Sequence, residues 1–164
     1  MRKWLRIAVF GRNLKMTLLR LLLWTVICLL IFRGALLRIE VDGISMLPTY
    51  QDHSKNWINR LAYIWHEPQR GDVVAIRMAG IHAMLLKRVI GLPGETIAFV
   101  SGQVLVNGEI LEEPYEKFPY DWNIQPVTLG ASQYYVVGDN RSMPEQNHTK
   151  GVCERERILG KILE

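Results

Sequence analysis

The chain has 164 residues, of which 49% are apolar, so it has room for one folded domain and a membrane anchor but not for two substantial domains. The formal charge is +4, yet six basic residues and no acidic residue lie in residues 1–20, which leaves 14 basic and 16 acidic residues elsewhere. Because a nucleic-acid-binding domain needs its basic surplus on a folded face, this distribution excludes that function, and we expect no nucleic-acid partner.

An uncharged, leucine-rich stretch, Leu21–Phe32, follows the basic residues. Extended to residues 16–37, the stretch has 22 residues and is interrupted by Arg20 and Arg33, whose long side chains can reach the lipid headgroups. A membrane-spanning helix needs about 20 apolar residues. We therefore predict a basic tail over residues 1–15 and a single transmembrane anchor over residues 16–37.

Two other interpretations of this stretch are weaker. A cleaved signal peptide would need a cleavage site between small residues, and no convincing small-x-small pattern follows Phe32. A helix lying in the membrane interface would need a polar face, which Leu21–Phe32 lacks. Since basic flanks stay on the cytoplasmic side, we expect a cytoplasmic N-terminus and place the β-rich domain of residues 38–164 on the extracytoplasmic side of a cell membrane.

The remainder of the chain predicts β-structure with turns, because it contains no long apolar stripe of helical period. Five segments combine β-branched or alternating apolar residues and are the expected strands: residues 72–77, 84–90, 96–100, 104–106 and 134–137. Tight turns are expected at Ser101-Gly102 and Asn107-Gly108, whereas residues 111–132, with three prolines, should be irregular. The predicted fold is mainly β, a partly closed antiparallel barrel or folded sheet with one N-terminal transmembrane helix.

A serine stands between a glycine and a proline-containing turn in Gly43–Thr49 (GISMLPT). In such a turn Ser45 can be exposed, with its own backbone N–H directed at a substrate carbonyl. A serine that merely caps a loop fits the same pattern, so this motif alone leaves both interpretations open.

Lys87 lies in the expected strand 84–90, on the same face as Leu85 and Val89 and opposite Arg88. If that face points inward, burial disfavours the ammonium and lowers the lysine pKa, so that the amine can act as general base to a serine hydroxyl. A lysine that extends from a strand edge into water is the alternative. Arg88 points the other way, and we expect its role to be structural.

A polar turn, Gly138–Arg141 (GDNR), follows the last expected strand and could brace the loop of an active site. No other nucleophile system competes, since the four histidines form neither a helical pair nor a triad pattern. No metal-ligand spacing joins them to Cys28 and Cys153, and a disulfide between these two cysteines is not expected because Cys28 lies in the apolar stretch. We therefore expect no metal and no cofactor.

Together these motifs resemble the type I signal peptidases, the serine–lysine membrane peptidases, in their bacterial form. Four blocks occur in the family's order: GISMLPT at residues 43–49, RGDVVAI at 70–76, KRVIGLPGE at 87–95 and GDNR at 138–141. Supporting similarity runs through residues 103–114 and 151–163, so the resemblance covers nearly everything after residue 38.

The resemblance implies a serine endopeptidase in which Ser45 attacks the scissile carbonyl and Lys87 takes its proton, with no histidine involved. The N–H of Ser45 would belong to the oxyanion hole, Met46 would lie near the substrate cleft, and Gly43 would stand where some relatives carry an oxyanion-hole hydroxyl. The expected supporting residues are Arg88, Asp139, Asn140, Arg141 and Ser142. Substrates would be exported preproteins with small residues, typically alanine, at positions −1 and −3 before the cut.

The segment after the GDNR turn departs from the family pattern. Pro144 stands where the family has a serine that hydrogen-bonds the lysine, and Gln146 and His148 stand where it has an Asp–Arg ion pair. Ser142, Asn147 or a water are the alternatives for orienting the lysine, and a Gln146–His148 contact could replace the ion pair.

Two other functions are compatible with the sequence. The altered residues 142–148 would suit a catalytically weak pseudo-peptidase or assembly factor that binds preproteins without cutting them, although Ser45 and Lys87 are both retained. A peptidase dedicated to one pilus- or conjugation-type substrate also fits, whereas a self-cleaving repressor would need a DNA-binding helix-turn-helix in place of the apolar stretch. We expect a monomer whose partners are preprotein signal peptides and the lipid bilayer.

Overall fold

A computed structural model describes residues 14–78, 84–115 and 120–163 of the chain. The chain divides into two compact units, Met1–Leu36 and Leu37–Glu164, and each is described by itself below. Cys28 and Cys153 both have free thiols.

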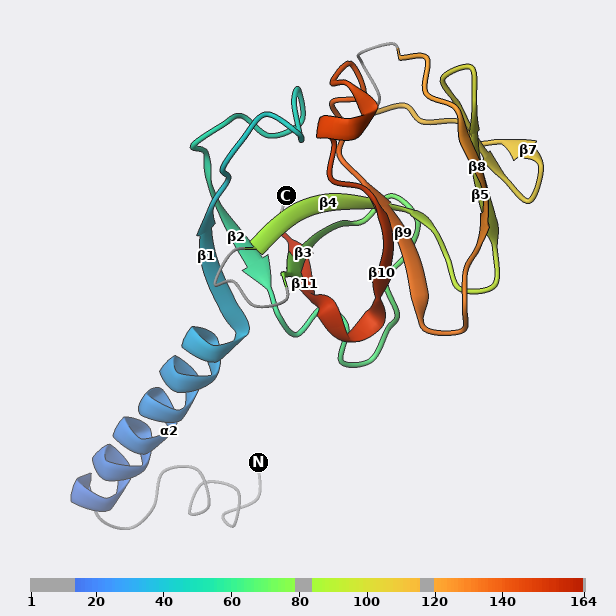
Figure 1. Ribbon diagram of the computed structural model, residues 1–164. Coiled ribbons are helices and arrows are strands. Elements are labelled where there is room, and N and C mark those ends of the chain that lie inside the picture. Colours follow the sequence, from blue (N-terminus) through green and yellow to red (C-terminus); the bar gives the residue numbers. More distant parts are fainter. Residues whose placement is uncertain (1–13, 79–83, 116–119, 164) are drawn as a thin grey trace. The chain divides into compact units, whose positions relative to one another are not determined.

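The first unit contains one long helix, α2, over Leu14–Ala35 (Figure 1). Its apolar side chains are exposed along its length, and within the described residues Lys15–Ala35 is long and apolar enough to cross a membrane. A signal sequence near an N-terminus would satisfy the same criterion of length and composition. The helix ends two residues before the predicted end of the anchor, because a strand begins at Leu36.

The second unit is built from two antiparallel sheets (Figure 1). The seven-stranded sheet has the order β1 (Leu36–Glu40), β2 (Lys55–Asn59), β11 (Ile158–Ile162), β3 (Val73–Arg77), β4 (Met84–Gly91), β9 (Gln133–Val137) and β10 (Gly151–Glu154). The four-stranded sheet has the order β7 (Glu109–Ile110), β6 (Gln103–Val106), β5 (Thr96–Val100) and β8 (Ile124–Thr128). Two short 3₁₀ helices, η1 (Glu145–Asn147) and η2 (Arg155–Arg157), complete the described elements.

The mainly β fold predicted from sequence is confirmed, and neither sheet closes into a barrel. All five expected strands are present, as are the turns at Ser101-Gly102 and Asn107-Gly108. One prediction is wrong, because the stretch 111–132 contains β8 rather than being irregular throughout. Pro126 lies inside this strand, and an edge strand tolerates a proline because its outward N–H makes no ladder bond.

Three hydrophobic clusters form the core of the second unit, and β4 contributes to all of them. Ile90 packs in the cluster between the two sheets, with Phe99 and Tyr135 among its members. Leu86 belongs to a second cluster and Val89 to a third. Every residue of β4 from Leu86 to Gly91 is therefore buried, whichever face it occupies.

Candidate active site

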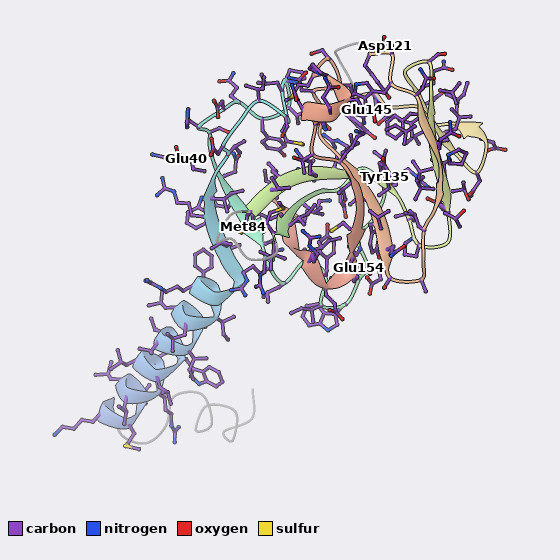
Figure 2. All side chains as sticks on the ribbon, in the orientation of Figure 1. Glu40, Met84, Asp121, Tyr135, Glu145 and Glu154 are labelled. Atoms are coloured by element: carbon purple, nitrogen blue, oxygen red, sulfur yellow. The ribbon has the colours of Figure 1, made fainter. Side chains whose placement is uncertain are left out.

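A groove of about 360 Å³ opens between β1 and the start of β4. Its walls carry apolar and charged side chains, and Figure 2 shows Glu40 of β1 and Met84 of β4 near each other at this place. The residues that line it are Arg38, Ile39, Glu40, Val41, Asp42, Ser45, Met46, Ala75, Met84, Leu85 and Leu86. Of the residues predicted for the site, the groove therefore includes Ser45 and Met46.

Ser45 lies in the loop that joins β1 to β2, and this loop is fixed from both sides. The side chain of Met46 is only 1% exposed and packs in the cluster that contains Leu86, which anchors the loop in the core. On the other side, Asn140 binds the loop twice: its N–H donates to the carbonyl oxygen of Ser45 at 3.0 Å, and its side-chain amide donates to that of Ile44 at 3.0 Å. The nucleophile candidate is thus held by its main chain at the wall of the groove.

The backbone N–H of Gly43 is engaged within the same loop. It donates to Asp52 Oδ1 at 2.8 Å, and Gly43 has φ +97°, a conformation that L side chains rarely adopt. Gly43 therefore shapes the loop, and its N–H does not point into the groove in this structure.

Lys87 lies on β4 opposite Val74 of β3, and its side chain is almost fully buried, with 2% exposure. Its Nζ lies 2.6 Å from Ser45 Oγ, the distance of a strong hydrogen bond. As expected, Lys87 shares its face with Val89 and Leu85, which pack in the third cluster. The period-2 pattern of the strand therefore gave the correct neighbours for the lysine.

Burial lowers the pKa of Lys87 to about 8, against the opposing effect of the Asp139 carboxylate, which raises it. Among the residues that the structure describes, no carboxylate forms an ion pair with this lysine. Near neutral pH an appreciable fraction of the amine is then unprotonated and can accept the proton of the Ser45 hydroxyl.

The neighbouring cation on β4, Arg88, has a different environment. Its guanidinium makes two hydrogen bonds with Asp139, at 2.8 and 2.6 Å, and a third with the carbonyl oxygen of Gly71 at 2.7 Å. The ring of Tyr115 covers the guanidinium with its centroid 3.9 Å away. Burial disfavours the charge, but Asp139 raises the pKa of Arg88, so this cation stays charged.

Asp139 is completely buried and also accepts a hydrogen bond from the hydroxyl of Thr49 at 2.5 Å. This bond ties the GDNR turn to the end of the Ser45 loop. Arg141, also completely buried, pairs with Glu113 at 2.5 Å and donates to the carbonyl oxygen of Gly138 at 2.7 Å. We call Arg88, Asp139, Arg141 and Glu113 the ion-paired frame.

Neither Ser142 nor Asn147, the two side chains considered for orienting Lys87, hydrogen-bonds to it in this structure. The hydroxyl of Ser142 donates to Asn140 Oδ1 at 2.7 Å instead of contacting the lysine. Asn147 is exposed in η1 and cannot reach a fully buried amine. No hydrogen bond joins Gln146 to His148, whose ring nitrogens make no hydrogen bond of good geometry among the described residues. The compact 3₁₀ turn that follows Pro144 accounts for these differences, since it directs the polar side chains of residues 145–147 to solvent.

Reasoning from sequence missed three contributors to this region. Glu113 and Tyr115 lie in the stretch predicted to be irregular, and only the tertiary fold brings them to the buried arginines. Thr49 could have been noticed, since it closes the GISMLPT block.

Comparison with known proteins agrees with the motifs. The family model described as "Signal peptidase, peptidase S26" matches residues 14–163. The chain is 34% identical over 131 residues to "Signal peptidase I" of Leptolyngbya laminosa, covering 75% of this chain and 64% of that protein. It is 36% identical over 127 residues to "Probable signal peptidase I-2" of a Synechocystis strain, covering 74% of this chain and 58% of that protein.

A further relative, "Signal peptidase I V" of Bacillus subtilis, is 33% identical over 137 residues, covering 75% of this chain and 81% of that protein. The solved structure of a signal peptidase I from Enterococcus faecalis aligns with 59% of this chain and 97% of its own length, at 26% identity and a TM-score of 0.49. The chain thus spans only about three fifths of the first two relatives. The match of the family model over nearly all described residues shows that the chain belongs to the signal peptidase family, peptidase S26.

Proposed function

We propose that this protein is a membrane-bound serine endopeptidase that removes N-terminal signal peptides from exported preproteins, with Ser45 as nucleophile and Lys87 as general base. The observation that carries the proposal is the 2.6 Å separation of Lys87 Nζ and Ser45 Oγ in a place where the lysine is buried and, within the described part of the chain, pairs with no carboxylate. Membership of the signal peptidase family supports the class of reaction.

In the acylation step the neutral amine of Lys87 takes the proton of Ser45 as Oγ bonds to the scissile carbonyl carbon. The tetrahedral intermediate then collapses, the C–N bond breaks, and the Lys87 ammonium returns the proton to the leaving amine. The same amine next deprotonates a water molecule, which hydrolyses the acyl-enzyme and regenerates the Ser45 hydroxyl. No histidine, metal or cofactor takes part in this scheme.

The negative oxygen of the tetrahedral intermediate needs a hydrogen-bond donor, and the backbone N–H of Ser45 is the donor we propose. One such donor is worth about 3 kcal/mol of transition-state stabilisation. The two hydrogen bonds from Asn140 to the main chain of Ile44 and Ser45 support this role, because they hold the peptide that would carry the donor.

The groove supports an extended peptide as substrate. β1 is an edge strand of the described sheet, and the part of β4 before Arg88 is not paired with β9, so both present backbone groups along the groove. A peptide can add to such edges as a strand, with alternate side chains entering the same wall. Met46, Ala75 and Leu86 make that wall apolar, and small residues at −1 and −3 would fit beside them.

We further propose that α2 anchors the protein in a plasma membrane as a single span, with a cytoplasmic N-terminus and the second unit on the extracytoplasmic side. The exposed apolar surface of α2 supports a membrane environment, and the basic residues that precede it support this orientation. Preprotein signal peptides, which are themselves membrane-associated, would then be the partners of a monomeric enzyme.

The leading alternative is a pseudo-peptidase that binds preproteins without cutting them, and the unusual residues 142–148 favour it. A peptidase with one dedicated substrate is the other alternative. Cleavage of several unrelated preproteins by the same enzyme would separate a general processing peptidase from a dedicated one.

The test uses the full chain in detergent micelles with preproteins that carry an Ala-x-Ala site. We expect wild type to cleave after the −1 alanine and both Ser45→Ala and Lys87→Ala to be inactive. Because protonated lysine cannot accept a proton, kcat/KM should rise with pH. It should reach half of its maximum near pH 8, the pKa of Lys87. Binding without cleavage by wild type would instead favour the pseudo-peptidase.

A further inference from the structure

His148 is a buried polar residue that the proposed reaction does not use. It is 4% exposed, and neither ring nitrogen makes a hydrogen bond of good geometry among the described residues, although the backbone of Thr149 interacts with the ring. Leaving a buried polar group unpaired costs about 1–3 kcal/mol. Stability therefore does not explain why a histidine is buried here, and its neighbours indicate a functional role.

The imidazole is packed between an aromatic ring and the glycine of the GDNR turn. The ring of Trp122 meets it edge-on, with centroids 4.9 Å apart. A Cβ built on Gly138 would lie 2.9 Å from both Cε1 and Nε2 of His148, and the same Cβ would overlap the carbonyl oxygen of Ser45. The His148 ring therefore lies beside Gly138, whose backbone lies against the carbonyl oxygen of Ser45, and only glycine fits at position 138.

The ring also lies within the electrostatic range of Lys87. Burial is the main cause that lowers the pKa of His148, to about 3, and the cations of Lys87, Arg141 and Lys150 lower it further, in that order. The imidazole is therefore neutral at any pH at which the enzyme would work. It is thus an uncharged ring within the electrostatic range of the lysine and adds no second positive charge there.

We propose that His148 is a positioning residue of the Ser45–Lys87 pair: its neutral ring supports Gly138 against the carbonyl of Ser45 and provides a polar neighbour for the lysine. This inference rests on the proposed function. The role is one that Pro144 cannot take, because a proline side chain has no hydrogen-bonding group.

Other charged groups near Lys87 must be considered when its pH dependence is interpreted. Ser45 and Asp139 face it from the nucleophile loop and the GDNR turn. A smaller cavity that Lys87 also lines carries Lys150, Cys153 and Arg157. Since substitutions of His148 leave all of these in place, a change in the titration of Lys87 reports on the imidazole.

The experiment compares three variants of His148 in the full chain in micelles, with kcat, KM, the pH profile of kcat/KM and the melting temperature as readouts. For His148→Ala we expect kcat to fall about 10- to 100-fold with KM within twofold, because a small displacement of reacting groups has effects of this size. The half-maximum of kcat/KM should move to higher pH, because water that enters the space restores solvation to the Lys87 ammonium.

The other two variants separate a polar role from simple packing. His148→Gln keeps a neutral polar group and should recover most of kcat, whereas His148→Phe keeps a ring without an acceptor and should not. The exposed His66, changed to alanine, is the matched control and should leave all four readouts unchanged.

The proposal is overturned if a folded His148→Ala variant keeps the wild-type kcat and pH profile. It is also overturned if His148→Phe has the kcat and pH profile of wild type. Failure of the proposed function looks different, since wild type itself would then cleave no preprotein. In that case an NMR titration of the Lys87 ε-methylene decides the inference: a higher midpoint in His148→Ala than in wild type supports it, and equal midpoints contradict it.

Discussion

Two neighbouring regions around β4 bury cations in opposite ways. In the ion-paired frame, Arg88 and Arg141 are each buried against a carboxylate, Asp139 and Glu113 respectively. In the serine–lysine pair, Lys87 is buried to the same degree but meets a hydroxyl. The arginines therefore stay charged, whereas the lysine has a pKa lowered to about 8.

The difference shows how one strand can carry both a structural cation and a base. Lys87 and Arg88 are adjacent, so strand alternation sends their side chains to opposite faces. Asp139 is committed to Arg88 by two hydrogen bonds, which limits how far it can stabilise a Lys87 ammonium. The frame thus holds the GDNR turn and, by occupying the carboxylate, helps to keep the lysine uncharged.

The largest expected effect on activity comes from replacing Lys87 by arginine, the residue type that the ion-paired frame buries. Lys87→Arg keeps a positive charge but removes the group that can release its proton near neutral pH. We expect kcat/KM for a preprotein to fall at least 10²- to 10⁴-fold, the usual contribution of a general base. Lys161→Arg, at a lysine that pairs with Asp72, is the control and should keep full activity. An active Lys87→Arg enzyme would disprove the role of the lysine as base.

Breaking the ion-paired frame should mainly reduce stability. Asp139→Asn leaves the buried Arg88 guanidinium without its carboxylate, and removing one partner of a buried pair costs about 3–5 kcal/mol. Denaturant unfolding of the full chain in micelles, followed by tryptophan fluorescence, measures this loss. The exposed Glu67, which pairs with Arg155, provides the contrast, since Glu67→Gln should cost less than about 1 kcal/mol. Equal losses for the two variants would contradict the distinction between buried and exposed pairs.

Removing the Lys87 amine should instead increase the free energy of unfolding at neutral pH. The pKa of Lys87 is about 8 in the folded protein and 10.5 is the ordinary value, so the unfolded chain binds more protons between these two pH values. Below pH 8 the buried ammonium destabilises the fold by about 3 kcal/mol, and this penalty disappears as pH rises toward 10.5. Lys87→Met should therefore be more stable than wild type at pH 7, with a difference that closes at high pH. A variant that is less stable at pH 7 would contradict this account.

The smallest effect should come from the link between the frame and the nucleophile loop. Thr49→Val keeps the shape of the side chain but loses the hydrogen bond to Asp139, at a cost of about 1 kcal/mol in unfolding free energy. Because Asn140 still holds the loop, we expect kcat to fall only a few-fold. A loss as large as that of Asp139→Asn would mean that the threonine, and not the ion pair, is the main support of the turn.

The sequence predicted the central pair but not its surroundings, for physical reasons. Alternation along a strand groups Lys87 with Leu85 and Val89, but the motifs around Ser45 and Lys87 each left a non-catalytic interpretation open, and the resemblance to the type I signal peptidases singled out the pair. The pairing of Arg141 with Glu113 joins residues that are far apart in sequence, and no local pattern encodes it. β8 was missed because Pro126 argues against a strand unless the strand is known to lie at an edge.

The burial of His148 was also beyond prediction, because a histidine followed by polar residues is typical of an exposed turn. Only the structure brings it under Gly138 and beside Trp122. In the same way, Asn147 does not reach Lys87 because it is exposed in the 3₁₀ helix η1, and the Ser142 hydroxyl donates to Asn140 instead. Side chains in short turns depend on tertiary packing that a sequence motif does not specify.

The most direct test of the central claim is the titration of Lys87 itself. Lysine ε-methylene NMR signals of the full chain in micelles would be followed from pH 6 to pH 11 (about the range that brackets both pKa values), with the Lys87 signal assigned by its loss in Lys87→Arg. The account predicts a midpoint of about 8 for Lys87. A midpoint near the ordinary lysine value of about 10.4 would contradict it, because the amine would then be fully protonated at neutral pH and could not serve as the base.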